Sequence, residues 1–331
     1  MNGIPFFPEQ ASKAAHEVDL IYYLLTALTI FFSLAVFAGV LYFVIKNLAG
    51  SKGDRHHPPS HNMKLELAWS VIPLFMSLAV FGWSAKLFVE MQKPIPSRDA
   101  LEVIVIGKQW MWHLQHPTGQ RENNTLHIPV GRPVKLTMIS QDVLHSFYIP
   151  AFRIKMDVIP GRYTTMWFEA TKTGTYHLFC AEFCGTKHAE MIGSVVVLTP
   201  EEYEQWLKDN QWGMQSQQRI ETMPEQGAKL FTRLGCNGCH APGSEGGPPL
   251  AGMYGTQRAL TDGRFVTADD NYIRDSILEP QKMVLSGYED KFMPTSPGIE
   301  EQQILQLIAY IRSLKEMPAA AAPINRNEAE G

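Results

Sequence analysis

The chain has 331 residues, of which 45% are hydrophobic and 19% charged, so it is long enough for about two domains that each bury a core. The formal net charge of −4 gives no electrostatic reason to expect nucleic acid as a partner. The four cysteines form two close pairs, Cys180/Cys184 and Cys236/Cys239, which is not the spacing of a disulfide framework. We therefore predict no structural disulfide and treat each pair as a candidate cofactor site.

Two apolar runs near the N-terminus predict a transmembrane hairpin over residues 1–95. The first run, about 20–45, carries no charge, and the second spans about 67–86. The first is longer than the roughly 20 residues that cross a bilayer, and the second is close to that length. A pair of buried core helices is the alternative, but soluble helices of this length have a polar face, and the first run has none.

The basic residues around these runs predict their orientation. The connector 46–66 holds Lys46, Lys52, Arg55 and Lys64, whereas the preceding segment 1–19 holds only Lys13. The positive-inside rule then places the connector in the cytoplasm and both termini outside. We expect a multi-pass protein of a bacterial inner (cell) membrane, with everything after residue 86 on the periplasmic or extracellular side.

Short β-branched segments separated by turn signals follow the hairpin. We predict strands at 101–106, 125–128, 134–139, 163–168, 175–179 and 194–198. This spacing favours a β-sandwich or Greek-key barrel, which we place at 96–200. Pro200 and the two following glutamates predict a helix over 200–209, and residues 201–222 are assigned to that helix and a linker.

The pattern changes to helices after the linker and predicts an all-α domain over 223–317. Pro224 begins one helix that runs into Cys236, a second spans 270–278, and the clearest spans 300–314 with its apolar residues on one face. The tail 318–331 is rich in Ala, Pro and Glu, and we predict that it is disordered.

The segment 236–240 is a C-x-x-C-H motif, the signature of c-type haem attachment. Two thiols at this spacing can reach two vinyl groups on one edge of the ring, while the adjacent His reaches the iron. A thioredoxin-like pair would need an α/β pattern, and a zinc site would need more Cys or His between 223 and 317; the sequence has neither. We predict one covalent haem c held by Cys236, Cys239 and His240.

Methionine is the usual second axial ligand of a haem that carries electrons at high potential. Met253, Met283 and Met293 are the candidates. We favour Met293, because the segment 291–294 resembles the Met-Pro loop of class I cytochromes c. That resemblance covers 223–316 and implies a six-coordinate haem that carries electrons and binds no substrate.

The segment 180–191 gathers soft metal ligands within twelve residues: Cys180, Cys184, His188 and Met191. Sulfur and nitrogen ligands with a weak Met select copper, whereas zinc, the alternative, has no use for the Met. Two bridging thiolates can hold two copper ions close enough to share one electron. The second ion needs another His, for which His145 is the candidate and His127 and His177 are weaker ones.

This cluster resembles the CuA loop of cytochrome c oxidase subunit II, and 145–150, 155–161 and the two-helix anchor match that family in the same order. The resemblance covers about 20–200 and implies a cupredoxin-like Greek-key barrel with a binuclear copper centre. Carried over residue by residue, it implies Cys180 and Cys184 as bridges, His145 and His188 as nitrogen ligands, Met191 as a weak ligand, and Glu182 as a ligand through its backbone carbonyl.

Three further roles follow from the same resemblance. The Glu182 side chain would touch a magnesium ion at the interface with subunit I. Trp110 matches a Trp that admits electrons, although Met111 stands where the family often has Tyr. Glu66 matches a residue near the mouth of a proton channel on the cytoplasmic side. A buried aromatic cluster and a charge at the membrane interface are the alternatives for Trp110 and Glu66.

A subunit II fused to a cytochrome c domain resembles the caa-type oxidases of bacteria. The resemblance implies that the haem receives electrons from an upstream cytochrome or quinol-oxidising complex. The copper centre then passes them to haem in subunit I, where O2 is reduced and protons are pumped. The expected partners are subunit I, subunit III and the lipid bilayer.

The charges of the two soluble regions favour a tethered donor. Residues 96–200 hold ten basic and eight acidic residues, and 218–317 hold ten and thirteen. A copper domain that captures a basic soluble cytochrome is expected to be acidic, and this one is not. Two other functions stay open from the sequence: the electron-input subunit of a nitric oxide reductase, and a stand-alone membrane-anchored electron carrier.

Overall fold

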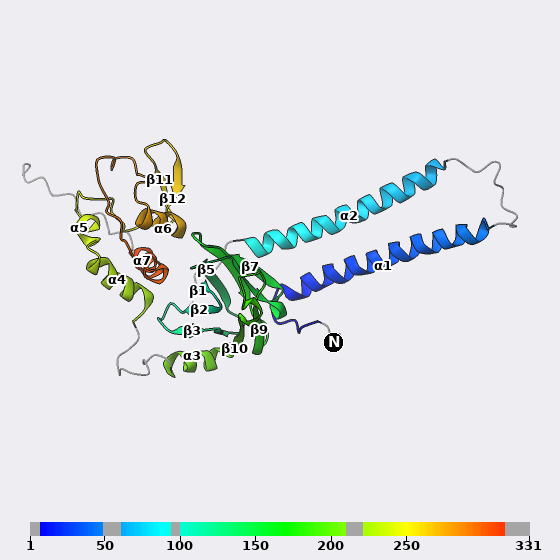
Figure 1. Ribbon diagram of the computed structural model, residues 1–331, viewed down its shortest axis with the longest axis horizontal. Coiled ribbons are helices and arrows are strands. Elements are labelled where there is room, and N and C mark those ends of the chain that lie inside the picture. Colours follow the sequence, from blue (N-terminus) through cyan, green and yellow to red (C-terminus); the bar gives the residue numbers. More distant parts are fainter. Residues whose placement is uncertain (1–6, 49–60, 94–99, 210–220, 315–331) are drawn as a thin grey trace, which may run out of the picture.

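The computed structural model describes residues 7–48, 61–93, 100–209 and 221–314. Figure 1 shows a pair of long helices, a β-sandwich and a smaller helical region in chain order. The predicted tail 318–331 lies outside the described residues, as do residues 49–60 of the connector and residues 210–220 of the linker.

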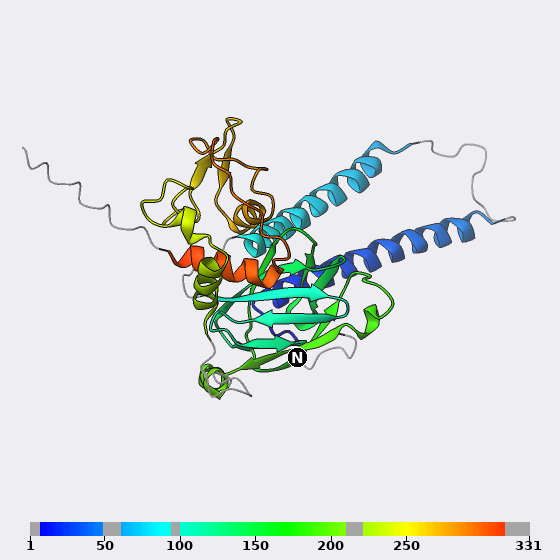
Figure 2. The same cartoon turned by 60° about the vertical axis from the view of Figure 1, so that its left-hand side comes forward.

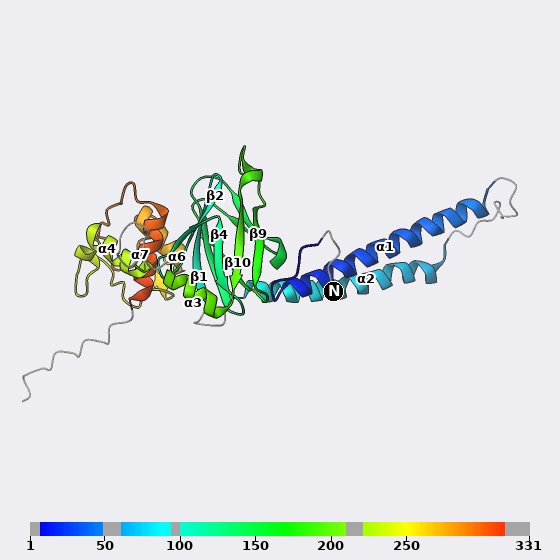
Figure 3. The same ribbon diagram turned by 90° about the horizontal axis from the view of Figure 1, so that it is seen from below.

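The two expected apolar helices are α1 (Ala15–Lys46) and α2 (Met63–Gln92). They run side by side away from the sheets (Figures 1 and 3), and their large apolar side chains are exposed, as Phe37 at 66% and Phe81 at 69% show. Such a surface is stable only in an apolar surrounding such as lipid. Both helices extend beyond the predicted apolar runs, and α2 does so because Asn62 caps its first turn.

Within the part of the chain that the structure describes, ten strands form two five-stranded sheets. The first has the order β3-β2-β1-β5-β8 and the second β4-β10-β9-β6-β7. Their bounds are β1 (Leu101–Lys108), β2 (Met111–Gln115), β3 (Arg121–Asn123), β4 (Thr125–Pro129), β5 (Pro133–Ser140), β6 (His145–Ile149), β7 (Ile154–Val158), β8 (Thr164–Glu169), β9 (Gly174–Cys180) and β10 (Ile192–Leu198). Pairs β1/β5 and β4/β10 are parallel and the other pairs are antiparallel. The predicted cupredoxin-like sandwich is confirmed.

Alternation along the strands buries one face of each sheet. In β5, Val134, Leu136 and Met138 face the sandwich core together with Trp112 and Phe147, and all five are fully buried. The two inner faces pack against each other to form the sandwich core. The outer face of the first sheet takes no part in that core and contacts the helical region.

The start of α1 is fastened to the sandwich. Arg153 holds Asp19 through two hydrogen bonds, Nε to Oδ1 at 2.8 Å and Nη2 to Oδ2 at 2.9 Å. The Ala11 N–H donates to the Ala151 carbonyl at 3.0 Å, and the Thr171 N–H donates to the Ala11 carbonyl at 2.9 Å. These contacts fix where the membrane hairpin leaves the sandwich.

The helical region is preceded by α3 (Pro200–Asp209), which ends the sandwich as predicted. Its helices are α4 (Met223–Arg233), α5 (Asn237–His240), α6 (Asp270–Leu278) and α7 (Glu301–Ser313), with a small hairpin of β11 (Gln257–Ala259) and β12 (Phe265–Thr267). The first predicted helix ends at Arg233, before Cys236, because Gly235 adopts a left-handed φ of 76°. Figure 2 shows α7, in red, lying across the first sheet.

Candidate metal and haem sites

The soft ligands predicted from the sequence meet at one end of the sandwich. The sulfur atoms of Cys180 and Cys184 are 3.7 Å apart, and the Cys184 sulfur lies 3.8 Å from the Met191 sulfur. His188 Nδ1 lies 3.5 Å from the Cys184 sulfur, and His145 Nδ1 lies 3.9 Å from the Cys180 sulfur. His145 begins β6 and Cys180 ends β9, while Cys184, His188 and Met191 lie on the loop 181–191, which contains the short 3-10 turn His188–Glu190.

The structure also orients the His145 ring. Its Nε2 lies 2.8 Å from an Asp142 carboxylate oxygen, so Nε2–H donates there and Nδ1 keeps its lone pair toward the thiols. Asp142 is held by the backbone N–H groups of Gln109 and Val143, each at 2.7 Å. Gly107 leaves room for the ring, because a Cβ there would lie 3.0 Å from the imidazole.

The two thiols differ in acidity. Burial raises the pKa of Cys180, but hydrogen bonds with His145 and backbone groups outweigh it and lower the pKa to about 6. Burial and the adjacent Cys180 raise the pKa of Cys184 to about 12. A cation bound between the sulfur atoms would stabilise the second thiolate and release its proton, which fits a soft metal such as copper.

The other predicted residues of this site lie close by. The Glu182 carbonyl is 3.3 Å from the Cys180 sulfur, and its carboxylate accepts from Lys155 at 3.0 Å. Trp110 donates its Nε1–H to the Cys184 carbonyl at 3.2 Å. Trp112, which is fully buried, packs edge-on against the His145 ring at 5.8 Å between centroids.

The weaker His candidates point elsewhere. His127 contacts Glu122 and stacks on Trp206 at 4.8 Å between ring centroids. His177 is exposed on β9 and stacks on Phe179. Among the described residues, the group of metal-binding side chains with ligand atoms within 4.8 Å of one another is His145, Cys180 and Cys184.

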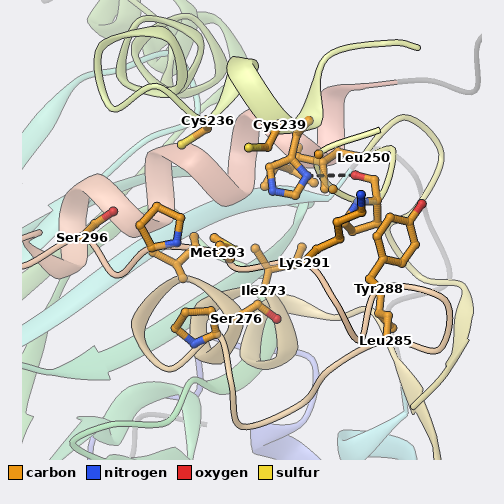
Figure 4. Close-up of a pocket in the computed structure, with 18 of the residues that line it drawn as sticks. Cys236, Cys239, Leu250, Ile273, Ser276, Leu285, Tyr288, Lys291, Met293 and Ser296 are labelled. Carbon is orange, nitrogen blue, oxygen red and sulfur yellow. Dashed lines mark hydrogen bonds between the residues drawn. The ribbon is translucent and has the colours of Figure 1, made fainter. Parts of the chain in front are cut away.

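The second cysteine pair lines a cavity of about 190 Å³ in the helical region. Figure 4 shows Cys236 and Cys239 on one wall of this cavity, with Met293 on the wall that faces them. Much of the remaining lining is aliphatic or aromatic, with side chains from α6, α7 and the loop before α7. Two thiols and an imidazole beside an apolar cavity fit a covalently attached haem.

The His240 ring is oriented as an iron ligand requires. Its Nδ1 donates to the Pro248 carbonyl at 2.8 Å, so Nε2 keeps its lone pair. A Cβ at Gly247 would lie 2.9 Å from His240 Cε1, so only Gly allows this loop to approach the ring so closely. Met253, Met283 and Met293 all line the cavity, so Met293 as axial ligand stays a prediction.

Glu66 lies in the first turn of α2, far along the chain from both cysteine pairs. Its carboxylate accepts a hydrogen bond from the Asn62 N–H at 3.0 Å, while the Asn62 side chain accepts from the Leu65 N–H. Because Asn62 and Glu66 cap the start of α2 reciprocally, the stability of this helix is sufficient to explain why a carboxylate stands at position 66.

Sequence reasoning missed Asp142, which orients the His145 ring from three residues before it; a carboxylate at that position was a usable signal. Pro248 was not missed: the segment 247–250 resembles the loop that packs against the proximal His in class I cytochromes c, and the Pro248 carbonyl accepts from His240.

Two family models match the chain. Residues 120–198 match the cytochrome C oxidase subunit II, periplasmic domain, and residues 224–315 match cytochrome c. Cytochrome c oxidase subunit 2 of Alkalihalophilus pseudofirmus is 33% identical over 297 residues, which is 86% of this chain and 83% of that protein. The chain belongs to the cytochrome c oxidase subunit II family.

Other members of the family match over shorter stretches. Cytochrome c oxidase subunit 2 of Thermostichus vulcanus is 32% identical over 257 residues, covering 62% of this chain and 78% of that one. A crystal structure of the periplasmic domain of subunit II of cytochrome oxidase (CoxB) of Bradyrhizobium japonicum is 30% identical, with a TM-score of 0.33, and covers 35% of this chain and 96% of that one.

This oxidase subunit II carries a fused cytochrome c domain, as the sequence predicted. The two domains imply copper and haem, and the apolar helices together with the family indicate a membrane-anchored subunit that partners a haem–copper oxidase core. The comparisons give no support to a nitric oxide reductase subunit or to a stand-alone carrier.

Proposed function

We propose that this chain is the electron-input subunit of a proton-pumping cytochrome c oxidase that reduces O2 to water. Electrons enter at the pocket of Cys236, Cys239 and His240 and continue to the cluster around Cys180 and Cys184. From there they pass to haem in subunit I, where O2 chemistry and proton pumping take place. When bound, a haem c and a binuclear CuA centre supply the two one-electron sites.

The observation that carries this proposal is the cluster of five soft side chains in a chain that also has a C-x-x-C-H pocket. The sulfur of Cys184 lies within 3.8 Å of the Cys180 and Met191 sulfur atoms, a spacing that suits two thiolates bridging a pair of ions. His145 and His188 would supply one nitrogen each, and Glu182 a carbonyl oxygen.

The chain's own residues prepare both sites before any cofactor arrives. Asp142 holds the His145 ring and Pro248 holds the His240 ring, each through the nitrogen that a metal does not need. A ligand whose orientation is fixed in advance loses less entropy on binding and moves less when the metal changes charge. Met293 completes the haem site in this proposal.

The whole chain is proposed as a multi-pass subunit of a bacterial inner membrane, with both termini and the metal sites on the periplasmic or extracellular side. Its partners are subunit I and subunit III, and its donor is an upstream cytochrome or quinol-oxidising complex. We retain the proposed limits of 1–95 for the hairpin, 96–200 for the copper domain, 201–222 for the helix and linker, and 223–317 for the cytochrome domain.

Three minor roles belong to the same proposal. Glu182 would reach a magnesium ion at the subunit I interface, in competition with Lys155, which it now contacts. Trp110 would admit electrons to the copper cluster, supported by its hydrogen bond to the Cys184 carbonyl. Glu66 would lie near a proton-channel mouth in addition to capping α2.

The test compares His145→Ala with the control His177→Ala in the purified oxidase complex. Loss of a ligand nitrogen should lower oxygen uptake by at least roughly tenfold, with the haem c absorbance unchanged. His177 is exposed on β9, beside the cluster but outside it, so its replacement should have little effect. Normal oxygen uptake in His145→Ala would refute the proposed route.

A further inference from the structure

Part of the outer face of the first sheet, over β1 and β5, is covered and not exposed to solvent. Strand β1 turns Val103 and Val105 into the sandwich core and Ile106 the other way, where it is 5% exposed. Ile139 of β5, which pairs with Ile106, is fully buried on the same outer face. Both isoleucines belong to one hydrophobic cluster with the apolar side chains of the cytochrome domain.

Helix α7 covers this outer face. It contributes Leu305 and Ile308 to the shared cluster, 3% and 2% exposed, while Leu307 and Ile311 line the cavity beside the C-x-x-C-H motif. One face of the helix thus lies on the copper domain and the other on the proposed haem pocket. Figure 2 shows the helix between the first sheet and the remainder of the cytochrome domain.

A partly buried ion pair ties the C-terminal end of α7 to β1. Arg312 contacts Glu102 through both terminal nitrogens, Nη1 to Oε2 at 2.8 Å and Nη2 to Oε1 at 2.9 Å. Lys135 adds a contact to Glu102 at 3.2 Å, and the guanidinium lies 5.0 Å from the Tyr254 ring centroid. Burial raises the pKa of Glu102, but Arg312 and Lys135 outweigh it and hold that pKa below its ordinary value.

A second set of contacts ties the opposite end of the interface to the segment that enters β8. The Tyr163 N–H donates to Asn271 at 2.9 Å, and its hydroxyl donates to Glu301 at 3.3 Å. Arg274 donates to the Gly161 carbonyl at 3.0 Å and to Glu301 through Nε at 3.0 Å. Polar contacts at both ends surround the apolar centre, as in a specific protein interface.

We infer that the outer face of β1, β5 and the entry to β8 is a docking surface for the chain's own cytochrome domain, which it holds in one orientation. Figures 1 and 3 show α5, which carries Cys239 and His240, on the side of α7 away from the sheet. Docking therefore leaves the cysteine side of the pocket open to a separate donor and turns α7 toward the copper domain. This inference rests on the proposed function of both sites.

The test is a double-mutant cycle on the full chain with its haem bound, in detergent. Denaturant unfolding of the cytochrome domain is followed by haem absorbance in Glu102→Gln, Arg312→Gln and the double variant. Either single change should raise the unfolding equilibrium constant of the cytochrome domain roughly tenfold, because it leaves a partly buried charge without its partner. The double variant should be no less stable than either single variant.

The matched control is Glu169→Gln, which removes the same charge from β8, where Glu169 pairs with exposed Lys13 at 3.5 Å. It should leave the unfolding of the cytochrome domain unchanged. The docking is refuted if the two single changes add in the double variant. It is also refuted if Glu102→Gln leaves the unfolding of the cytochrome domain unchanged, as Glu169→Gln does. Haem and copper content of the same preparations separate the two ideas: if both are normal, docking alone has failed, and if either metal is absent, the proposed function has failed.

Discussion

Two imidazoles in this oxidase subunit are each fixed through one ring nitrogen, and the other nitrogen is left for a metal. His145 donates from Nε2 to Asp142, and His240 donates from Nδ1 to the Pro248 carbonyl. The acceptors differ in charge. A carboxylate is a charged acceptor and a backbone carbonyl a neutral one, so the two rings are held by hydrogen bonds of different strength.

Met293→Ala tests the axial ligand at the residue scale. If Met293 completes the haem site, its removal opens one face of the iron, and added carbon monoxide should shift the absorbance of the reduced haem. Met283→Ala is the matched control, since Met283 lines the same cavity. If carbon monoxide binds to the haem of Met283→Ala and not to that of Met293→Ala, the axial ligand is Met283 and the prediction of Met293 is wrong.

Ligands that lie close together in the sequence could be predicted from it. In the C-x-x-C-H motif and in the segment 180–191, the spacing of the ligands alone indicates which cofactor each one is suited to bind. The loop 247–250 was expected to pack against His240 from its resemblance to class I cytochromes c, but the role of Asp142 was not predicted, because its contact with His145 depends on a turn whose geometry appears only in the folded chain.

At the scale of elements, α4 and α7 cross with almost no space between their backbones. A Cβ at Gly227 of α4 would lie 2.0 Å from the Gln306 carbonyl oxygen of α7 and 2.7 Å from the Tyr310 Cβ. Backbone atoms cannot give way as a flexible side chain can, so the two helices would have to move apart. The same crossing positions α7 between the cavity and the first sheet.

Gly227→Ala should therefore destabilise the cytochrome domain by about 1–3 kcal/mol, despite the higher helix propensity of Ala. Denaturant unfolding followed through the haem absorbance measures it. Gly238→Ala is the control, because no atom lies within 4 Å of its added Cβ. Equal stability of the two variants would contradict the close crossing.

The predicted elements were most accurate where periodicity was long or a cap was present. Helices 200–209 and 270–278 match α3 and α6 in their bounds, and each begins with a clear N-terminal signal. Strands β2, β3 and β7 were not predicted, because they have only three to five residues and carry aromatic or charged side chains. Their place in a sheet is set by neighbouring strands more than by their own pattern.

At the scale of the whole molecule, both junctions of the copper domain are fixed by charge pairs. Arg153 holds Asp19 at the start of the membrane hairpin, and Glu102 holds Arg312 at the cytochrome domain. The apolar hairpin, the β-domain and the helical domain could be predicted in this order from the sequence pattern. Their mutual contacts could not be predicted, because each pair joins residues more than 130 positions apart.

The central claim is that one chain holds a haem and a pair of copper ions. Metal analysis with electron spin resonance on the full chain, purified without subunit I, tests it most directly. We predict two copper ions and one iron per chain, with one unpaired electron shared by both copper ions. Zinc in place of copper, or a single copper with the signal of an isolated ion, would contradict the account.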